Sequence, residues 1–262
     1  MLYGIVSGAW GDALAGLAYI SNHLVVGGAI CTSPYSRVAK FVGDQDFIRD
    51  VRVSQRDKLA VCGWREPELR DYISSMLAWD CGLGTDHVVY TGLDFANPPV
   101  LTKAISLRQS DHEAAERAVG GLPPFIHFHP YSLNSTPLSH HHPAWGLVTE
   151  LLHKSTAQVV KTGISPVCGR GIDLVGTTAC VTECFAISNK AALTITTSNS
   201  IAVWCAMQGL PCVVLCNKKL TSAEHFWARL LSSSPSVKVV LFDDGIAKAI
   251  DVVSESLQLA CI

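Results

Sequence analysis

The stretch AALTITTSNSIAVWCAMQGLPCVVLCN, residues 191 to 217, decides the fold class of this chain. An apolar run, Leu193 to Thr196, leads through four small polar residues into a helical segment. A turn at Gly209-Leu210-Pro211 and a second apolar run, Cys212 to Cys216, follow. A strand, a helix and another strand at this spacing form one βαβ unit, which indicates a parallel sheet.

The polar residues before the helix carry the first functional hypothesis. Ser198, Asn199 and Ser200 can cap the helix, and residues of these types are common as simple caps. The first N–H groups of a helix have no partner within it, so a helix start with short hydroxyl side chains is also suited to bind phosphate. The motif leaves both interpretations open.

Strands and helices alternate along the rest of the chain, which predicts an α/β fold with largely parallel sheets. In the first half we expect strands at Leu2 to Val6, Leu24 to Cys31, Lys58 to Cys62, His87 to Tyr90 and Lys103 to Leu107, and helices at Asp12 to Asn22, Pro34 to Val42, Glu66 to Trp79 and Asp111 to Val119. In the second half we expect further strands at Phe125 to His129, Gln158 to Thr162 and Lys238 to Phe242, and helices at Pro143 to Lys154, Thr178 to Ile187 and Gly245 to Leu259.

The pair Pro123-Pro124, after Gly120-Gly121, interrupts regular structure and predicts a domain boundary. The expected domains are residues 1–122 and 123–262. Each resembles a Rossmann-like domain, and two such domains facing each other leave a central cleft at the carboxyl ends of their strands.

Composition narrows the functional class. The 262 residues are 48% hydrophobic and carry 20 basic and 22 acidic side chains without a dense basic run, which argues against a large non-specific nucleic-acid surface. The ten cysteines are scattered without a CxxC pair, which is typical of reduced thiols in the cytoplasm. No run of 18 apolar residues and no signal-peptide pattern occurs, so we expect no membrane span.

Asp12 is the candidate general base, because it follows the first strand at the start of a predicted helix. A carboxylate there can accept the proton of a hydroxyl group. Asp is also among the best residues for capping a helix, so a purely structural role is the alternative.

The histidines raise the question of a metal site. His127 and His129 alternate on one predicted strand, and His140 to His142 follow in a loop. Neither an HExxH motif nor a CxxC pair accompanies them, so we predict no functional metal. His129, at the carboxyl end of its strand, is interpreted instead as a hydrogen-bond donor to the substrate.

The chain resembles the GT-B glycosyltransferases, most closely the heptosyltransferase-like group called glycosyltransferase family 9. The resemblance lies in four segments: Ile5 to Asp12, Phe125 to Ser139 with Trp145 after it, Val159 to Gly163, and Thr197 to Leu215. In the last of these, Gly209 and Pro211 match the family. Ser198 stands where the family has an acidic residue, and Val203 stands where it has a histidine.

The resemblance implies a two-domain transferase that moves a sugar from a nucleotide-sugar donor to an acceptor hydroxyl, by an inverting and metal-independent reaction and without a cofactor. It implies Asp12 as the base, with Trp10 and Gly11 on the acceptor side. The expected donor-binding residues are His129, Tyr131, Ser132, Asn134, Lys161, Arg170, Glu183, Ser198, Asn199 and Ser200.

Two alternatives remain open on the same scaffold. A nucleotide-sugar epimerase would need a second carboxylate, for which Glu183 is the candidate, and a catalytically inert binding protein fits the exchanges at Ser198 and Val203.

The acceptor is either a glycan or a hydroxymethylated DNA base, as in small phage enzymes of this fold. The first half offers aromatic residues that could stack on a flipped base: Trp10, Tyr35, Trp64, Tyr72 and Trp79. The oligomeric state is not specified by the sequence.

Overall fold

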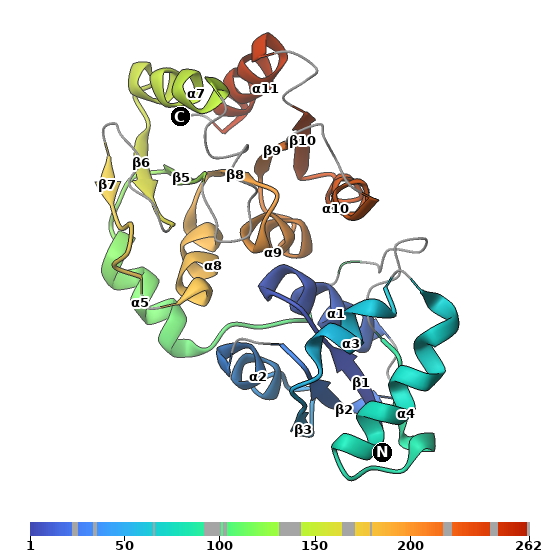
Figure 1. Cartoon of the computed structure of the whole chain (residues 1–262). Helices are drawn as coiled ribbons and strands as arrows, with labels where there is room; N and C mark the ends of the chain where they lie inside the picture. Colours follow the sequence, from blue (N-terminus) through green and yellow to red (C-terminus); the bar gives the residue numbers. More distant parts are fainter. Residues whose placement is uncertain are drawn as a thin grey trace. The chain divides into compact units, whose positions relative to one another are not determined.

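The computed structural model is an α/β fold with parallel sheets (Figure 1). It describes residues 1–22, 26–33, 36–64, 66–91, 101, 104–130, 143–163, 171–178, 180–216, 222–241 and 246–260. The chain divides into two compact units, Met1–Ser106 and Leu107–Ile262.

In the first unit, the described strands form a four-stranded sheet in the order β3-β2-β1-β4, and every pairing is parallel. The strands are β1 (Leu2–Val6), β2 (Val26–Cys31), β3 (Asp50–Val53) and β4 (Val88–Val89). The helices are α1 (Trp10–Asn22), α2 (Ser36–Gly43), α3 (Asp57–Cys62) and α4 (Arg70–Asp80), with short 3₁₀ turns at Pro67–Leu69 and Thr85–His87.

In the second unit, the described strands form a six-stranded parallel sheet in the order β10-β9-β8-β5-β6-β7. The strands are β5 (Phe125–His129), β6 (Gln158–Lys161), β7 (Ile172–Asp173), β8 (Leu193–Thr197), β9 (Cys212–Cys216) and β10 (Val237–Leu241). The helices are α5 (Gln109–Val119), α7 (Pro143–Lys154), α8 (Val181–Lys190), α9 (Ser200–Gln208), α10 (Ser222–Ser232) and α11 (Ile246–Leu259). The βαβ unit predicted from residues 191 to 217 is therefore confirmed as β8, α9 and β9.

Two predicted strands are wrong. Residues 58 to 62 belong to the helix α3, because the N–H of Ala60 donates to the carbonyl of Arg56 and Asp57 adds a negative charge to the first turn. The described residues 104 to 107 form no strand either. The strands β3 and β7 and the helix α10 were not predicted.

The division between the units falls earlier in the chain than the proline pair suggested. Helix α5 packs against α8, and Ala115 and Val119 of α5 share a buried cluster with Ala186 and Ile187 of α8. This apolar contact places residues 107 to 122 in the second unit.

The second sheet has a different side-chain composition on each face. Ile126 and Phe128 of β5 pack against α7 and α11, in a cluster that includes Trp145 and Val253. The alternate residues of the same strand point toward the face covered by α5, α8 and α9 (Figure 1). This second face buries histidine, threonine and serine side chains: His127, His129, Thr162, Thr194, Thr196 and Ser188. Polar groups so deeply buried are normally hydrogen-bonded inside the protein, and among these side chains Thr194 Oγ1 is the exception within the described residues.

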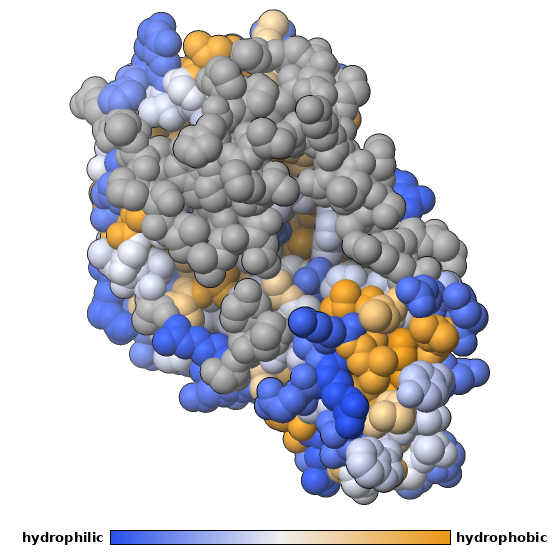
Figure 2. All heavy atoms as spheres, in the orientation of Figure 1, coloured by the Kyte–Doolittle hydropathy of each residue, from blue (hydrophilic) through white to orange (hydrophobic). Residues whose placement is uncertain are grey.

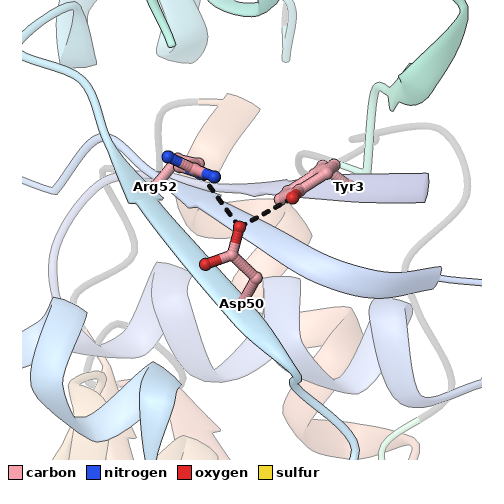
Figure 3. Close-up of polar contacts among 3 residues, drawn as sticks. All are labelled: Tyr3, Asp50 and Arg52. Carbon is pink, nitrogen blue, oxygen red and sulfur yellow. Dashed lines mark hydrogen bonds and ion pairs between the residues drawn. The ribbon is translucent and has the colours of Figure 1, made fainter. Parts of the chain in front are cut away.

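A polar contact crosses the first sheet from β1 to β3 (Figure 3). Tyr3, Gly28 and Asp50 stand side by side on three neighbouring strands. The Tyr3 hydroxyl donates to Asp50 Oδ2 at 2.7 Å, and the same oxygen accepts from Arg52 Nε at 2.9 Å. The tyrosine ring reaches across β2 because Gly28 has no side chain: a Cβ atom there would lie 2.4 Å from the ring.

The visible face of the first unit carries apolar residues where Figure 1 places α3 and α4 (Figure 2). Tyr72 and Trp79 of α4 are 59% and 72% exposed.

Within the described residues, no helix combines the length and the apolar composition that a membrane crossing requires. The cysteines at described positions are free thiols.

We predict that Gly28→Ala destabilises the first unit by about 2 kcal/mol, because the new methyl group overlaps the Tyr3 ring and displaces its hydroxyl from Asp50. Gly27→Ala is the matched control, since its Cβ would meet only flexible side chains, those of Met1 at 3.2 Å and Arg49 at 4.0 Å. Urea unfolding followed by circular dichroism measures both variants. Equal midpoints would contradict the role of Gly28.

Candidate functional site

Each unit carries a group of hydrogen-bonded polar residues at the carboxyl ends of its strands. In the first unit we call Gly8, Asp12, Thr32 and Asp57 the Asp12 cluster. Gly8 follows β1, Thr32 follows β2, Asp12 lies in the first turn of α1, and Asp57 begins α3. Because the parallel strands β1 and β2 end at the same edge, the turns after them come together there.

Asp12 closes the turn between β1 and α1. Its Oδ2 atom accepts a hydrogen bond from the backbone N–H of Ala9 at 2.8 Å, so the carboxylate does cap the helix. Gly8 adopts a φ of +84°, and a Cβ atom on it would lie 2.5 Å from Asp12 Oδ2. The turn therefore needs glycine at this position to hold the carboxylate in place.

Asp57 ties the same turn to the next strand end. Its Oδ1 atom accepts from the backbone N–H of Gly8 at 2.8 Å and from the hydroxyl of Thr32 at 3.1 Å. Two carboxylates from distant parts of the sequence are thus bound to adjacent residues of one turn.

The surroundings of Asp12 change its acidity. Protein atoms around the carboxyl group remove most of its water, although the residue keeps a partly exposed surface. This burial raises its pKa to about 7, the hydrogen bond from Ala9 acts in the opposite direction, and the negative charge of Asp57 raises the pKa further. A carboxyl group with this pKa can accept a proton near neutral pH.

The predicted acceptor-side residues lie beside this cluster. Gly11 is in the first turn of α1, and the half-buried Trp10 ring contacts Phe41 of α2 edge-on, with the ring centroids 5.5 Å apart. Their contact with an acceptor stays a prediction. Tyr35 lies outside the described residues.

In the second unit, Asn199 is the cap of α9. Its side-chain oxygen accepts from the backbone N–H groups of Ile201 at 2.9 Å and Ala202 at 3.2 Å. Its Nδ2 atom donates to the hydroxyl of Thr196, which donates to the backbone carbonyl of His129 at 2.7 Å. These bonds connect the start of α9 with the end of β5. Ser198 and Ser200, on either side of Asn199, are partly exposed.

The buried histidines form a second network with α8. His127 Nδ1 lies 2.8 Å from the hydroxyl of Ser188, and His127 Nε2 lies 2.7 Å from the hydroxyl of Thr162. His129 Nδ1 lies 2.7 Å from the same Thr162 hydroxyl. We call His127, His129, Thr162 and Ser188 the histidine network.

Burial keeps both imidazoles neutral. It holds the pKa of His127 well below its usual value, and the neighbouring His129 acts in the same direction. Burial also lowers the pKa of His129 to about 4. At neutral pH each ring therefore carries one N–H group and one nitrogen with a free lone pair.

Two other predicted donor-site residues lie in described positions. Lys161 is buried, and its Nζ atom pairs with Asp173 Oδ2 of the neighbouring strand at 3.3 Å. Its charge is thus already matched by a carboxylate. Glu183 lies in the first turn of α8 and is partly exposed. Tyr131, Ser132, Asn134, Arg170 and the histidines at 140 to 142 lie outside the described residues.

Within the part of the chain that the structure describes, no three His, Cys, Asp or Glu side chains gather as metal ligands would. The absence of a metal and of a cofactor stays a prediction.

Sequence reasoning missed Asp57, Thr32, Thr162 and Ser188. Asp57 was hidden because the strand before it, β3, was not predicted. For Thr162 a partial signal existed, because it ends the predicted strand that follows the histidine-bearing strand in the sequence and pairs with it in the structure. Ser188 could only be found from the packing of α8.

Neither a protein-family model nor a curated protein sequence matches this chain. Solved structures do match it in fold. A glycosyl transferase of family 9 from Veillonella parvula has 12% identity and a TM-score of 0.59, with 93% of this chain and 86% of that chain covered. The ADP-heptose lipopolysaccharide heptosyltransferase II of E. coli has 13% identity and a TM-score of 0.60, with 99% and 98% covered.

A third solved structure is the iron-containing dodecameric glycosyltransferase TibC from enterotoxigenic E. coli. It has 12% identity and a TM-score of 0.51, with 90% of this chain and 61% of that chain covered. The three similarities show that this chain has the fold of GT-B glycosyltransferases, which confirms the predicted fold class.

We predict that acid destabilises the second unit. Since the folded-state pKa of His129 is about 4 and the unfolded value is near 6.5, the unfolded chain binds more protons as the pH falls, and stability is lost below about pH 6.5. His129 alone should remove roughly 2 to 3 kcal/mol between pH 7 and pH 4.5. Urea unfolding at several pH values measures this loss, which should be smaller in His129→Gln. An identical pH dependence in the variant would contradict the assignment.

Proposed function

We propose that this chain is a glycosyltransferase that moves a sugar from a nucleotide-activated donor to an acceptor hydroxyl, in one inverting step and without a metal ion. The observation that supports it most is the Asp12 carboxyl group, which is held in a glycine-dependent turn with a pKa of about 7. The shared fold with GT-B glycosyltransferases agrees with this role.

Asp12 is the proposed general base. One of its carboxylate oxygens takes the proton of the acceptor hydroxyl while the acceptor oxygen bonds to the anomeric carbon of the sugar. The bond between that carbon and the diphosphate oxygen breaks, and its electron pair leaves with the diphosphate. A single displacement of this kind inverts the configuration at the anomeric carbon.

The start of α9 is proposed to hold the leaving diphosphate. The helix dipole favours negative charge at this end, and the hydroxyl groups of Ser198 and Ser200 can donate to phosphate oxygens. Asn199 acts indirectly in this proposal, because its side-chain oxygen is bound to the N–H groups of Ile201 and Ala202. It fixes the geometry of the turn that carries the two serines.

The first choice of donor is an ADP-linked sugar, because one matched structure is an ADP-heptose transferase. A glycan and a hydroxymethylated DNA base are the candidate acceptors, and the exposed rings of Tyr72 and Trp79 offer aromatic surface to a base. The free cysteines fit the reducing cytoplasm.

A panel of ADP-, UDP- and GDP-sugars with both acceptor classes tests this function. Transfer is expected to produce free nucleoside diphosphate and a glycosylated acceptor in equal amounts. Interconversion of sugars without nucleotide release would instead identify an epimerase. Donor binding without any turnover would identify an inert binding protein.

We predict that Asp12→Asn lowers kcat by about 10²- to 10⁴-fold, because the amide cannot accept a proton. The variant should still fold, since its side-chain oxygen can accept the N–H of Ala9. Donor affinity, measured by calorimetry, should stay within about twofold, because the substitution leaves the donor-binding unit unchanged. Wild-type turnover in this variant would remove Asp12 from the mechanism.

We predict that Asp57→Asn shifts the pH–rate profile to lower pH. In the wild type, kcat/KM should rise with pH and level off above about pH 7, as Asp12 ionises. The negative charge of Asp57 helps to raise the pKa of Asp12, so its neutralisation moves the rising limb toward acid. The asparagine oxygen can keep the bonds from Gly8 and Thr32.

Asp71→Asn, on the exposed surface of α4, is the matched control for Asp57→Asn and should leave the profile unchanged. If the rising part of the pH–rate profile is not shifted in Asp57→Asn, then Asp57 does not affect the pKa of Asp12.

A further inference from the structure

We propose that His129 Nε2 is a hydrogen-bond acceptor that recognises a hydroxyl or amino group of the nucleotide-sugar donor and does not bind its phosphates. The identity of the ligand rests on the proposed function. Whether Nε2 accepts or donates a hydrogen bond, which we call its polarity, follows from the histidine network alone. In this network the position of one hydrogen determines the position of the next.

The network begins at a backbone carbonyl, which can only accept. The hydroxyl of Ser188 lies 3.1 Å from the carbonyl oxygen of Cys184, one turn earlier in α8, and donates its only hydrogen to it. The serine oxygen then has lone pairs left for its other neighbours, the Cys205 thiol and His127 Nδ1, the latter at 2.8 Å. His127 must therefore carry its hydrogen on Nδ1.

The assignment continues through Thr162. Since His127 is neutral and protonated at Nδ1, its Nε2 atom accepts the hydrogen of the Thr162 hydroxyl at 2.7 Å. That hydroxyl has no second hydrogen to give. It must accept from His129 Nδ1, also 2.7 Å away, so His129 carries its hydrogen on Nδ1 as well.

A neutral His129 with Nδ1 protonated has a lone pair on Nε2. His129 ends β5 in the middle of the sheet, at the edge where Thr196 connects it to the start of α9. It is 7% exposed, and no described residue donates to Nε2. The hydrogen bond of the His129 ring within the described residues runs through Nδ1, so Nε2 is available to accept one from a ligand at this strand end.

The opposite polarity has a specific cost. It would turn the Ser188 hydrogen toward His127 and leave the Ser188 and Cys184 oxygens facing each other at 3.1 Å without a hydrogen between them. Ser188 has no exposed surface, so water cannot relieve this contact.

The polarity selects the chemistry of the ligand. Diphosphate oxygens that carry no hydrogen at neutral pH have only lone pairs to offer to Nε2. Ribose and sugar hydroxyls and the amino group of a base carry hydrogens that fit. The donor role for His129 that the sequence suggested is thereby reversed.

The tautomer of His129 is measured by nitrogen NMR of the full chain with ¹⁵N-labelled histidine at pH 7. We expect a protonated Nδ1 and an unprotonated Nε2, with the signals assigned by their loss in His129→Gln. A hydrogen on Nε2, whether alone or on a charged ring, would overturn the proposal.

Ser188→Ala tests the origin of the polarity. It removes the acceptor of His127 Nδ1, so we expect the His129 signals to shift toward the other tautomer. Ser256→Ala is the matched control: Ser256 donates to the carbonyl of Val252 one turn earlier in α11, in the same way, but takes no part in the hydrogen bonds of His127 and His129. Unchanged His129 signals in Ser188→Ala would show that Cys184 and Ser188 do not set the polarity.

The ligand class is tested by calorimetry with ADP, UDP, GDP and inorganic pyrophosphate. His129→Leu should weaken the nucleoside diphosphate that binds the wild type by about tenfold and leave pyrophosphate binding unchanged. An equal loss for both ligands would assign His129 to the phosphates and overturn the proposal. If no nucleoside diphosphate binds the wild type, the proposed function and the ligand assignment both fail, whereas the NMR result still decides the polarity.

Discussion

The burial of polar groups at the carboxyl ends of parallel strands is the constraint on which the Asp12 cluster of the first unit and the histidine network of the second unit both depend. Buried polar atoms need partners, so each one fixes the position and the proton of the next. At the end of β1 the desolvated group is an acid, and burial raises the pKa of Asp12 to about 7. At the end of β5 it is a base, and burial lowers the pKa of His129 to about 4. One physical effect thus gives a carboxyl group that can exchange a proton near neutral pH and an imidazole that cannot.

The sequence predicted the alternation of strands and helices because short apolar runs are separated by capping and turn residues, as β8, α9 and β9 illustrate. It failed at residues 58 to 62, where a short apolar run fits a strand and a buried helix equally well. It also missed β3, a strand at the edge of the sheet in which Asp50 is partly exposed and Arg52 is exposed. These errors concealed Asp57, since a carboxylate at the start of α3 is only noticed once α3 is recognised as a helix.

The chemical roles were less predictable than the elements. Asp12 could be proposed from its position after the first strand, but its pKa is raised first by burial and then by the charge of Asp57, which is distant in sequence. The histidine network joins residues from β5, α8 and the end of β6, and its polarity depends on a single backbone carbonyl, that of Cys184. Sequence patterns give residue types and local spacing, whereas proton positions depend on contacts between elements.

The start of α9 shows how a structural role limits a functional one. The Asn199 oxygen occupies two of the N–H groups that a phosphate would otherwise use, so an anion there must compete with the cap or bind beside it. Val203, at the position where the resemblance places a histidine, is fully packed inside the unit and offers no polar atom. The start of α9 is linked by hydrogen bonds, through Thr196, to the backbone carbonyl of His129. In the proposed mechanism, therefore, donor recognition lies at the end of the neighbouring strand β5, through His129 Nε2, and the phosphates are left to Ser198 and Ser200.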